Sequence, residues 1–249
     1  GEVTVNVFPN PVLTITASSG AICFGDPSVI SVSSSIAATT FEWSTGETTA
    51  NITVSPASTS TYFVTGTSAN GCTGTASIEI IVNPLPVISV AASDANICVG
   101  ENSVLTATSD IPGSSFLWST GANTASITVS PTATTTYNVT VTSPEGCVST
   151  GEVTVNVFPN PVLTITASDM EICNGASATI NASSTISGTA FEWNTGSTNS
   201  SITVGPNTTT TYSITGTAAN GCIGTTNIEI IVNPLPTITT TVTDSIICD

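Results

Sequence analysis

The sequence predicts an all-β protein, a tandem array of small two-sheet β-sandwich domains. Two observations support this fold class. The first is a period of 75 residues, which relates Trp43, Trp118 and Trp193 without insertion or deletion. Because this period exceeds the 20–50 residues of solenoid repeats, each unit is expected to be a small domain of its own. The second is an alternation of apolar and hydroxyl residues, as in residues 12–16, which is typical of half-buried strands.

The period also predicts where the domains begin and end. The expected divisions are residues 1–8 (last strand of a preceding repeat), 9–83, 84–158 and 159–233 (three complete repeats) and 234–249 (first strand of a fourth repeat). Residues 1–18 recur unchanged at 151–168, so a super-repeat of 150 residues is also present. The chain is therefore expected to be an internal segment of a longer protein or a mature fragment.

Each repeat is expected to contain six or seven short strands, and no stretch shows a helical period of useful length. In the first repeat the strand-like segments are 12–16, 29–33, 40–43, 52–54, 62–65 and 76–80. Asn70-Gly71 and Asn220-Gly221 are predicted to form two-residue type I′ hairpin turns, and Glu145-Gly146 stands at this place in the middle repeat. This number of strands around a tryptophan and two cysteines favours a sandwich.

The recurring aromatic residues are expected to fill the space between the two sheets. They are Trp43, Trp118, Trp193, Tyr62, Tyr137 and Tyr212. Phe41 and Trp43 are two positions apart, so both point to the same face of a strand. A competing interpretation gives Trp43 a role in stacking on sugars.

The composition excludes several classes of chemistry, because the chain has no Lys, Arg or His against 16 Asp and Glu residues. Without an imidazole or amine base, Ser-His-Asp and Cys-His nucleophiles cannot be assembled. Binding to nucleic acid needs cations, and the net charge of −16 opposes it. We therefore predict no enzyme, no catalytic residue, no cofactor and no metal site. Calcium at the domain junctions stays open as an alternative, although no D-x-D-x-D-G spacing supports it.

The cysteines are expected to form one structural disulfide in each repeat. Cys248 is then unpaired, because the sequence stops before its partner. The predicted pairs are Cys23–Cys72, Cys98–Cys147 and Cys173–Cys222. Each pair closes a loop of about 50 residues, which the chain-entropy model values near 4 kcal/mol. Disulfides indicate an exported protein. Free buried thiols or a metal site are the alternatives.

The junctions between repeats carry a Pro-x-Pro motif, as in Pro84-Leu85-Pro86 and Pro159-Asn160-Pro161. Proline fixes φ and favours an extended path in the residue before it, so these linkers are expected to be short and stiff. If entry and exit lie at opposite ends of each domain, the domains stack end to end. Each repeat would then add roughly 35–45 Å of length.

Each repeat carries the motif string C-x-G, F-x-W-[SN]-T-G, I-T-V-x-P, T-Y-x-[VI]-T and G-C. Domains with this string resemble the immunoglobulin-like or PKD-like repeats of very large surface adhesins of Bacteroidetes. The type IX secretion system exports those proteins, and the gliding-motility adhesin SprB is similar in style. The resemblance covers the three complete repeats. It implies an immunoglobulin-like sandwich within a cell-surface filament that contacts surfaces or polysaccharide.

The resulting functional hypothesis is a structural and adhesive segment of a long extracellular filament, acting as a stiff, protease-resistant stalk. The expected partners are further repeats, neighbouring filaments that bundle laterally, and surface polysaccharide. No segment reaches the roughly 20 apolar residues of a membrane span. Ser245, in Asp244-Ser245-Ile246, is a candidate for O-glycosylation. The alternatives are a spacer or carbohydrate-binding module of a secreted polysaccharide hydrolase, and an ice-binding protein with T-x-T runs.

Overall fold

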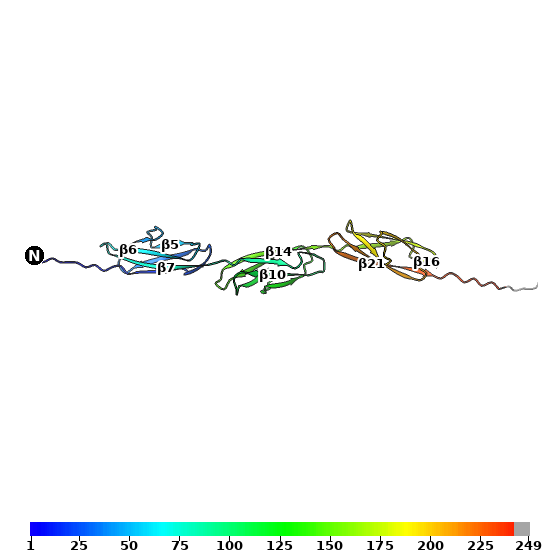
Figure 1. Cartoon of the computed structure of the whole chain (residues 1–249), viewed down its shortest axis with the longest axis horizontal. Coiled ribbons are helices and arrows are strands. Elements are labelled where there is room, and N and C mark those ends of the chain that lie inside the picture. The colour runs from blue at the N-terminus through cyan, green and yellow to red at the C-terminus, as the bar shows by residue number, and fades with distance from the viewer. Residues whose placement is uncertain (242–249) are drawn as a thin grey trace, which may run out of the picture. The chain divides into compact units, whose positions relative to one another are not determined.

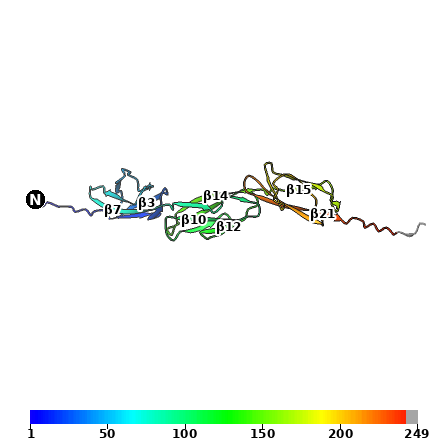
Figure 2. The ribbon, with the colours of Figure 1, turned by 45° about the vertical axis from the view of Figure 1, so that its right-hand side comes forward.

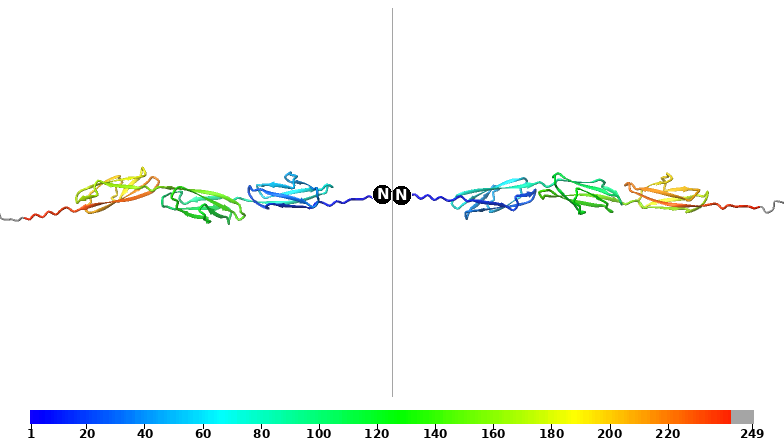
Figure 3. Two further views of the ribbon diagram at one scale, coloured as in Figure 1. Left: turned by 180° about the vertical axis from the view of Figure 1, so that it is seen from behind. Right: turned by 90° about the horizontal axis from the view of Figure 1, so that it is seen from below.

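The computed structural model describes residues 1–241, and within them every regular element is a β-strand (Figures 1 and 3). The first repeat contains β1 (Leu13–Ala17), β2 (Ala21–Cys23), β3 (Ser28–Ser34), β4 (Thr40–Trp43), β5 (Asn51–Val54), β6 (Ser60–Thr67) and β7 (Thr73–Asn83). The second contains β8 (Ile88–Ala92), β9 (Asn96–Cys98), β10 (Ser103–Ser109), β11 (Ser115–Trp118), β12 (Ser126–Val129), β13 (Thr135–Thr142) and β14 (Val148–Phe158). The third contains β15 (Leu163–Ala167), β16 (Glu171–Cys173), β17 (Ala178–Ser184), β18 (Ala190–Trp193), β19 (Ser201–Val204), β20 (Thr210–Thr217) and β21 (Ile223–Asn233).

Each repeat builds one three-stranded and one four-stranded sheet with the same strand order. In the first repeat the orders are β1-β3-β5 and β2-β7-β6-β4, so β3 and β7 lie in different sheets (Figure 2). The second repeat has β12-β10-β8 and β11-β13-β14-β9, and the third has β15-β17-β19 and β16-β21-β20-β18. The predicted all-β fold is confirmed.

The chain divides into two compact units, and the middle repeat contributes residues to both. The first unit comprises Gly1–Ala92, Val104–Ile127 and Thr136–Val153; the second comprises Ser93–Ser103, Thr128–Thr135 and Thr154–Asp249. Residues 1–12, which include the expected last strand of a preceding repeat, form no strand in this chain.

In the first unit, the core of the first repeat lies between its two sheets. Ile30 of β3 and Ile80 of β7 are fully buried, and Trp43 of β4 is 3% exposed. Strand β3 alternates between buried and more open positions, so its valine and isoleucine side chains do not all share one face. The alternation seen in the sequence therefore places one face of the strand in the core.

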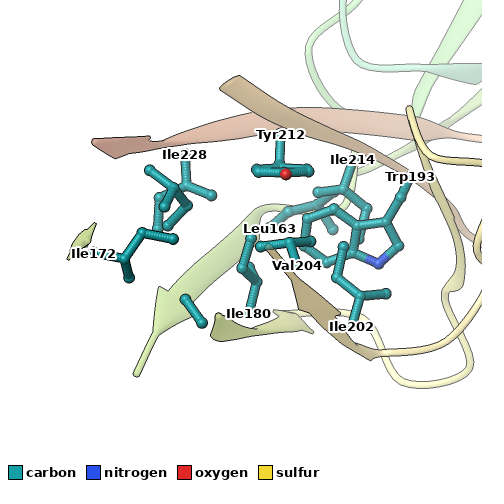
Figure 4. Packing of buried hydrophobic residues seen from close by; sticks show 11 residues of the cluster. Leu163, Ile172, Ile180, Trp193, Ile202, Val204, Tyr212, Ile214 and Ile228 are labelled. Atoms are coloured by element: carbon teal, nitrogen blue, oxygen red, sulfur yellow. The ribbon is translucent and has the colours of Figure 1, made fainter. Parts of the chain in front are cut away.

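In the second unit, the third repeat has the equivalent core (Figure 4). The indole of Trp193 lies beside Ile202 and Ile214, and the ring of Tyr212 lies over the same cluster. These residues come from both sheets, so their contacts hold the two layers together.

The first segment of each repeat changes sheets. Strand β1 pairs antiparallel with β3, whereas β2, four residues further on, pairs parallel with the end of β7. The sequence did not predict β2, because three residues are too few to show a period. The register of the parallel pair places Cys23 opposite Asn83, the last residue of β7.

The predicted type I′ turns are wrong. A type I′ turn needs positive φ at two successive residues. At the first hairpin Gly71 has φ +81°, but Asn70 is not among the residues with positive φ. The amide of Ser68 donates to the carbonyl of Cys72, and the amide of Gly71 donates to Ser68. The loop therefore has three residues and ends on a left-handed glycine, the second most common hairpin design.

Candidate functional site: cysteines that join successive repeats

The two cysteines of one repeat lie at opposite ends of its longest strand. Cys72 stands immediately before Thr73, where β7 begins, and Cys23 lies opposite Asn83, where β7 ends. A strand of 11 residues spans about 35 Å at the usual rise of ~3.3 Å per residue. Disulfide-bonded cysteines have Cα atoms only about 4.4–6.8 Å apart. A disulfide between Cys23 and Cys72 is therefore geometrically excluded.

The structure instead joins the first repeat to the second and the second to the third. Cys23 is bonded to Cys147 with a Cα–Cα distance of 5.5 Å, and Cys98 is bonded to Cys222 with a Cα–Cα distance of 5.6 Å. Both pairs are separated by 124 residues in the sequence. Each pair lies within a single compact unit, the first pair in the first unit and the second pair in the second.

The predicted pairs Cys23–Cys72, Cys98–Cys147 and Cys173–Cys222 are thus wrong. Four of these six cysteines are disulfide-bonded, but with partners one repeat away. Cys72 is a half-buried free thiol and Cys173 is an exposed free thiol. The prediction fails because the parallel pairing of β2 with the end of β7 places Cys23 at the end of the sandwich opposite the 68–72 turn. Cys248 and Ser245 lie outside the described residues.

The sequence could not have chosen between these pairings. A strict 75-residue period is kept equally well by pairs separated by 26, 49 or 124 residues. The deciding feature is the end of the sandwich at which β2 finishes, and no local pattern records it.

We call the short strands β2, β9 and β16 the switching strands, because each pairs with the sheet opposite to that of the strand before it. Backbone hydrogen bonds fix the position of the cysteine that ends a switching strand. The amide of Phe24, just after Cys23, donates to the carbonyl of Asn83 at 2.9 Å. The amide of Val99 donates in the same way to Phe158 at 3.0 Å. Asn83 and Phe158 each stand immediately before a Pro-x-Pro motif, so this cysteine is anchored at the point where its repeat ends.

The partner cysteine ends a tight turn and is deeply buried. Cys147 and Cys222 are 0% and 1% exposed. The amide of Cys147 donates to Oγ of Ser143 at 3.2 Å, and the amide of Cys222 donates to Oδ1 of Asn220 at 3.2 Å. These bonds hold the sulfur at a fixed place on the turn before the last strand begins.

The tryptophans lie in the cores, which excludes the sugar-stacking interpretation of Trp43. Trp43, Trp118 and Trp193 are only 2–3% exposed. Each indole Nε1 donates to a backbone carbonyl six residues further on, at 2.8–2.9 Å. The indole therefore has its one polar group satisfied inside the sandwich, as buried tryptophans generally do. The tyrosines at the equivalent positions 62, 137 and 212 are 7–8% exposed.

The acidic residues form no concentrated site. Glu42 and Glu192 are exposed, and so is Leu117, which replaces them in the middle repeat. Within residues 1–241, no group of three or more acidic or cysteine side chains is placed so that it could hold a metal ion. No helix in this part of the chain could cross a membrane.

A surface hollow of about 550 Å³ lies over strands β4 and β6 of the first repeat. Its lining is mostly threonine: Thr39, Thr40, Phe41, Glu42, Thr48, Thr65 and Thr67. The hydroxyl groups and one carboxylate offer polar contacts to a ligand, and the half-buried ring of Phe41 offers an apolar one.

Comparison with known proteins places the fold. No family model matches the sequence, and no curated protein matches it. Among solved structures, the N-terminal eight Ig domains of Down syndrome cell adhesion molecule match over 86% of this chain and 35% of that chain. The identity is 12% and the TM-score 0.52. This chain therefore spans about a third of the length of that structure.

Two further solved structures have lower TM-scores. Three Ig domains of titin, in an E-to-A mutated variant, are 11% identical with a TM-score of 0.48 and cover 92% of this chain and 100% of their own. A Ca²⁺-stabilized adhesin that helps an Antarctic bacterium bind ice is 20% identical with a TM-score of 0.37 and covers 90% and 74%. Together with the paired sheets, the likeness to the cell adhesion molecule shows that the chain is a tandem array of immunoglobulin-like β-sandwiches.

Proposed function

We propose that this chain is a structural and adhesive repeat segment of a long extracellular surface filament, where it acts as a stiff, protease-resistant stalk. The observation that carries the proposal is the disulfide pattern, because each bond joins one repeat to the next. Such a bond adds a second covalent connection at a junction, which strengthens a chain that is held under tension.

The proposal includes the division into domains at residues 9–83, 84–158 and 159–233, flanked by parts of further repeats. The two sheets of each repeat fall inside these ranges. Disulfides persist in oxidising compartments, which supports an extracellular, cell-surface location. The resemblance to gliding-motility adhesins exported by type IX secretion agrees with that location.

Two features support resistance to proteases and contact with other filaments. The chain has no Lys or Arg, so trypsin-like enzymes have no residue to cut after. Strands β1, β2, β4 and β5 are edges of their sheets and offer unpaired backbone groups for lateral association. The threonine-lined hollow of the first repeat is the surface we assign to polysaccharide contact.

Solution scattering of the oxidised 249-residue chain tests the stalk. An end-to-end arrangement of three repeats gives a radius of gyration about twice the ~18 Å of a compact globule of this length. A radius close to the globular value would overturn the stalk. Digestion with thermolysin, which does not need basic residues, checks protease resistance in the same samples.

Binding to immobilised polysaccharides tests the adhesive part. Neutral and acidic polysaccharides are compared, with the reduced and alkylated chain unfolded in denaturant as the control. Retention of the folded chain alone supports adhesion. If neither polysaccharide retains it, the adhesive part is wrong and the chain is a stalk only. Glycan binding together with a catalytic domain in the flanking sequence would favour the hydrolase-spacer alternative.

A further inference from the structure

Two groups approach the carbonyl oxygen of the residue before a Pro-x-Pro motif, a backbone amide next to one cysteine and the sulfur of another cysteine. We call these groups the two halves of the junction. At Asn83, one half is the amide of Phe24, which follows Cys23 and donates to the carbonyl. The other half is Cys147, whose sulfur lies 4.0 Å from the same oxygen. Phe158 repeats this arrangement with the amide of Val99 and the sulfur of Cys222 at 3.9 Å. Where both halves are present, the two cysteines are bonded.

Two further positions carry one half each. At Asn233, the amide of Asn174, next to Cys173, donates to the carbonyl at 3.0 Å. At Phe8, the thiol of Cys72 donates to the carbonyl at 3.6 Å. The two free thiols therefore occupy the same backbone environments as their bonded counterparts, one at each kind of half-site.

We use the word staple for a disulfide that joins two repeats in this way. We propose that Cys72 and Cys173 each occupy one half of such a staple, and that each forms a disulfide with a cysteine of a further repeat of the same kind. Cys173 would bond the cysteine that precedes the last strand of the following repeat. Cys72 would bond the cysteine that ends the switching strand of the preceding repeat. This inference rests on the proposed function as a repeat filament, and it adds how successive repeats are held.

The bond forms by thiol–disulfide exchange. Two thiols give one disulfide, and the two electrons and two protons pass to a small-molecule disulfide such as oxidised glutathione, which leaves as two thiols. The exposed Cys173 is accessible to this exchange.

A continuous staple creates a short covalent path through the filament. From Cys147 the path follows β14, the Pro159-Asn160-Pro161 motif, β15 and β16 to Cys173, which is 26 positions further on. At Cys173 the path passes through the proposed disulfide to the following repeat. A second path follows residues 72–98 and then passes through the disulfide between Cys98 and Cys222. Much of this segment is extended strand, so it is already close to its maximum reach.

The paths would carry tension past most of each sandwich. A path of 26 positions reaches at most about 90 Å for every two repeats, against about 500 Å for the 150 residues that two repeats contain. The segment between the two cysteines of a repeat, such as residues 99–146, lies outside both paths. The strands that it contains are therefore shielded from a pulling force.

The test extends the 249-residue chain by a second copy of residues 100–249, which continues the 75-residue period without a break. A glutamyl endopeptidase, which cuts after Glu, places every cysteine of the chain on a separate fragment. Those fragments are 3–42, 48–79, 80–101, 146–152, 172–192, 193–229 and the C-terminal fragment. Each oxidised chain is alkylated, digested without reduction and mapped by mass spectrometry.

In the original chain we expect fragment 3–42 linked to 146–152, fragment 80–101 linked to 193–229, and Cys173 alkylated. In the extended chain we expect a new link between fragments 172–192 and 146–152, which the original chain lacks because its single 146–152 fragment is bonded to 3–42. The second copy of 172–192 stays alkylated, because no repeat follows it. Cys72 stays alkylated in both chains and is the internal control. Absence of the link between 172–192 and 146–152 from the extended chain, or a link from 172–192 to 193–229, would overturn the proposal.

A Cys147→Ser variant of the original chain distinguishes specific pairing from random oxidation. It should leave Cys23 alkylated and the Cys98–Cys222 link unchanged, whereas scrambling would give Cys23 a new partner. Scattering of the extended chain separates this proposal from the proposed function. The expected links in a compact particle would leave the staple standing and remove the stalk. An elongated particle without the link between 172–192 and 146–152 would do the opposite.

Discussion

Ala38 is the single non-glycine residue with positive φ in the described part of the chain, at +57°. The equivalent positions in the other two repeats are Gly113 and Gly188, with φ of +81° and +75°. An L-residue in the left-handed region is strained by contact of its Cβ with the backbone, whereas glycine is not. The first repeat therefore carries a local strain that the other repeats avoid.

We expect Ala38→Gly to stabilise the first repeat by about 1 kcal/mol, since the released strain exceeds the entropy cost of glycine. Denaturant unfolding followed by fluorescence measures the change. Gly188→Ala is the matched reverse variant, because a Cβ at Gly188 would meet nothing within 4 Å. It should destabilise the third repeat by a similar amount. Two changes of the same sign would contradict this explanation.

Tyr62 and Tyr212 occupy equivalent places but have different electrostatic surroundings. Burial raises the pKa of both phenols above their ordinary value, and the carboxylate of Glu47 raises the pKa of Tyr62 further. In the third repeat Ser197 stands where Glu47 stands in the first. The neutral form of each buried tyrosine contributes to the stability of the fold. Because the folded-state pKa lies above the unfolded one, this contribution is complete below pH ~10 and is lost as the pH rises through the folded pKa.

We expect Glu47→Gln to lower the pKa of Tyr62 and to leave that of Tyr212 unchanged. The phenol carbon signals of the two residues, followed by NMR from about pH 9 to about pH 12, measure both values in one sample. An equal shift at both tyrosines would show a change in the fold rather than the loss of a local charge.

At the level of elements, the middle repeat exchanges volume between neighbouring strands. A Cβ on Gly66 of β6 would lie 2.7 Å from the side chain of Leu13, so this position needs glycine as long as leucine faces it. The middle repeat has Val141 there, with Ile88 in place of Leu13. A Cβ on its Gly151 would lie 2.7 Å from Val90, so the small residue has moved to the neighbouring strand β14. Repeats of different sequence thereby keep one backbone.

The disulfides join repeats, and this changes what reduction should do to each sandwich. Neither bond closes a loop inside one repeat, so the cores around Trp43 and Trp193 do not depend on them.

We expect reduction of the disulfides with dithiothreitol to leave the far-UV circular dichroism and the tryptophan emission at room temperature unchanged. The chain unfolded in guanidinium is the control. Loss of the β signal on reduction alone would show that the bonds are needed for folding of single domains.

At the scale of the molecule, the two disulfides interlock. The shortest covalent path between the chain ends passes from Cys23 to Cys147, back along the chain to Cys98, and from there to Cys222. We therefore expect the oxidised chain, pulled from its ends until fully unfolded, to reach about two fifths of the length of the reduced chain. Single-molecule force spectroscopy measures both lengths.

The control for this measurement is the double variant Cys23→Ser, Cys98→Ser, which removes both bonds. Its fully extended length should equal that of the reduced chain under either condition. An oxidised chain as long as this variant would show that the bonds do not form in solution.

The sequence alone determined the all-β fold and the aromatic core, because both depend on local patterns, and it displays the 75-residue period directly. Alternating apolar residues specify the faces of a strand, and the spacing of Phe41 and Trp43 directs both side chains to one face. The absence of Lys, Arg and His leaves this chain without an imidazole or amine base to activate a nucleophile. Strand β2 and the three-residue hairpin loops were missed, because each depends on a few residues whose conformation their neighbours decide.

Only the tertiary structure decided which cysteines are bonded. The period permits several separations, among them 26, 49 and 124 residues. The choice depends on a parallel pairing between residues about 60 positions apart, Cys23 and Asn83. That pairing sets the two cysteines of one repeat at opposite ends of β7, about 35 Å apart. A disulfide needs two cysteines close together, and the pairing of strands across the whole sheet decides which cysteines are close. For this reason the sequence identified the cysteines, and the fold determined that they connect one repeat to the next.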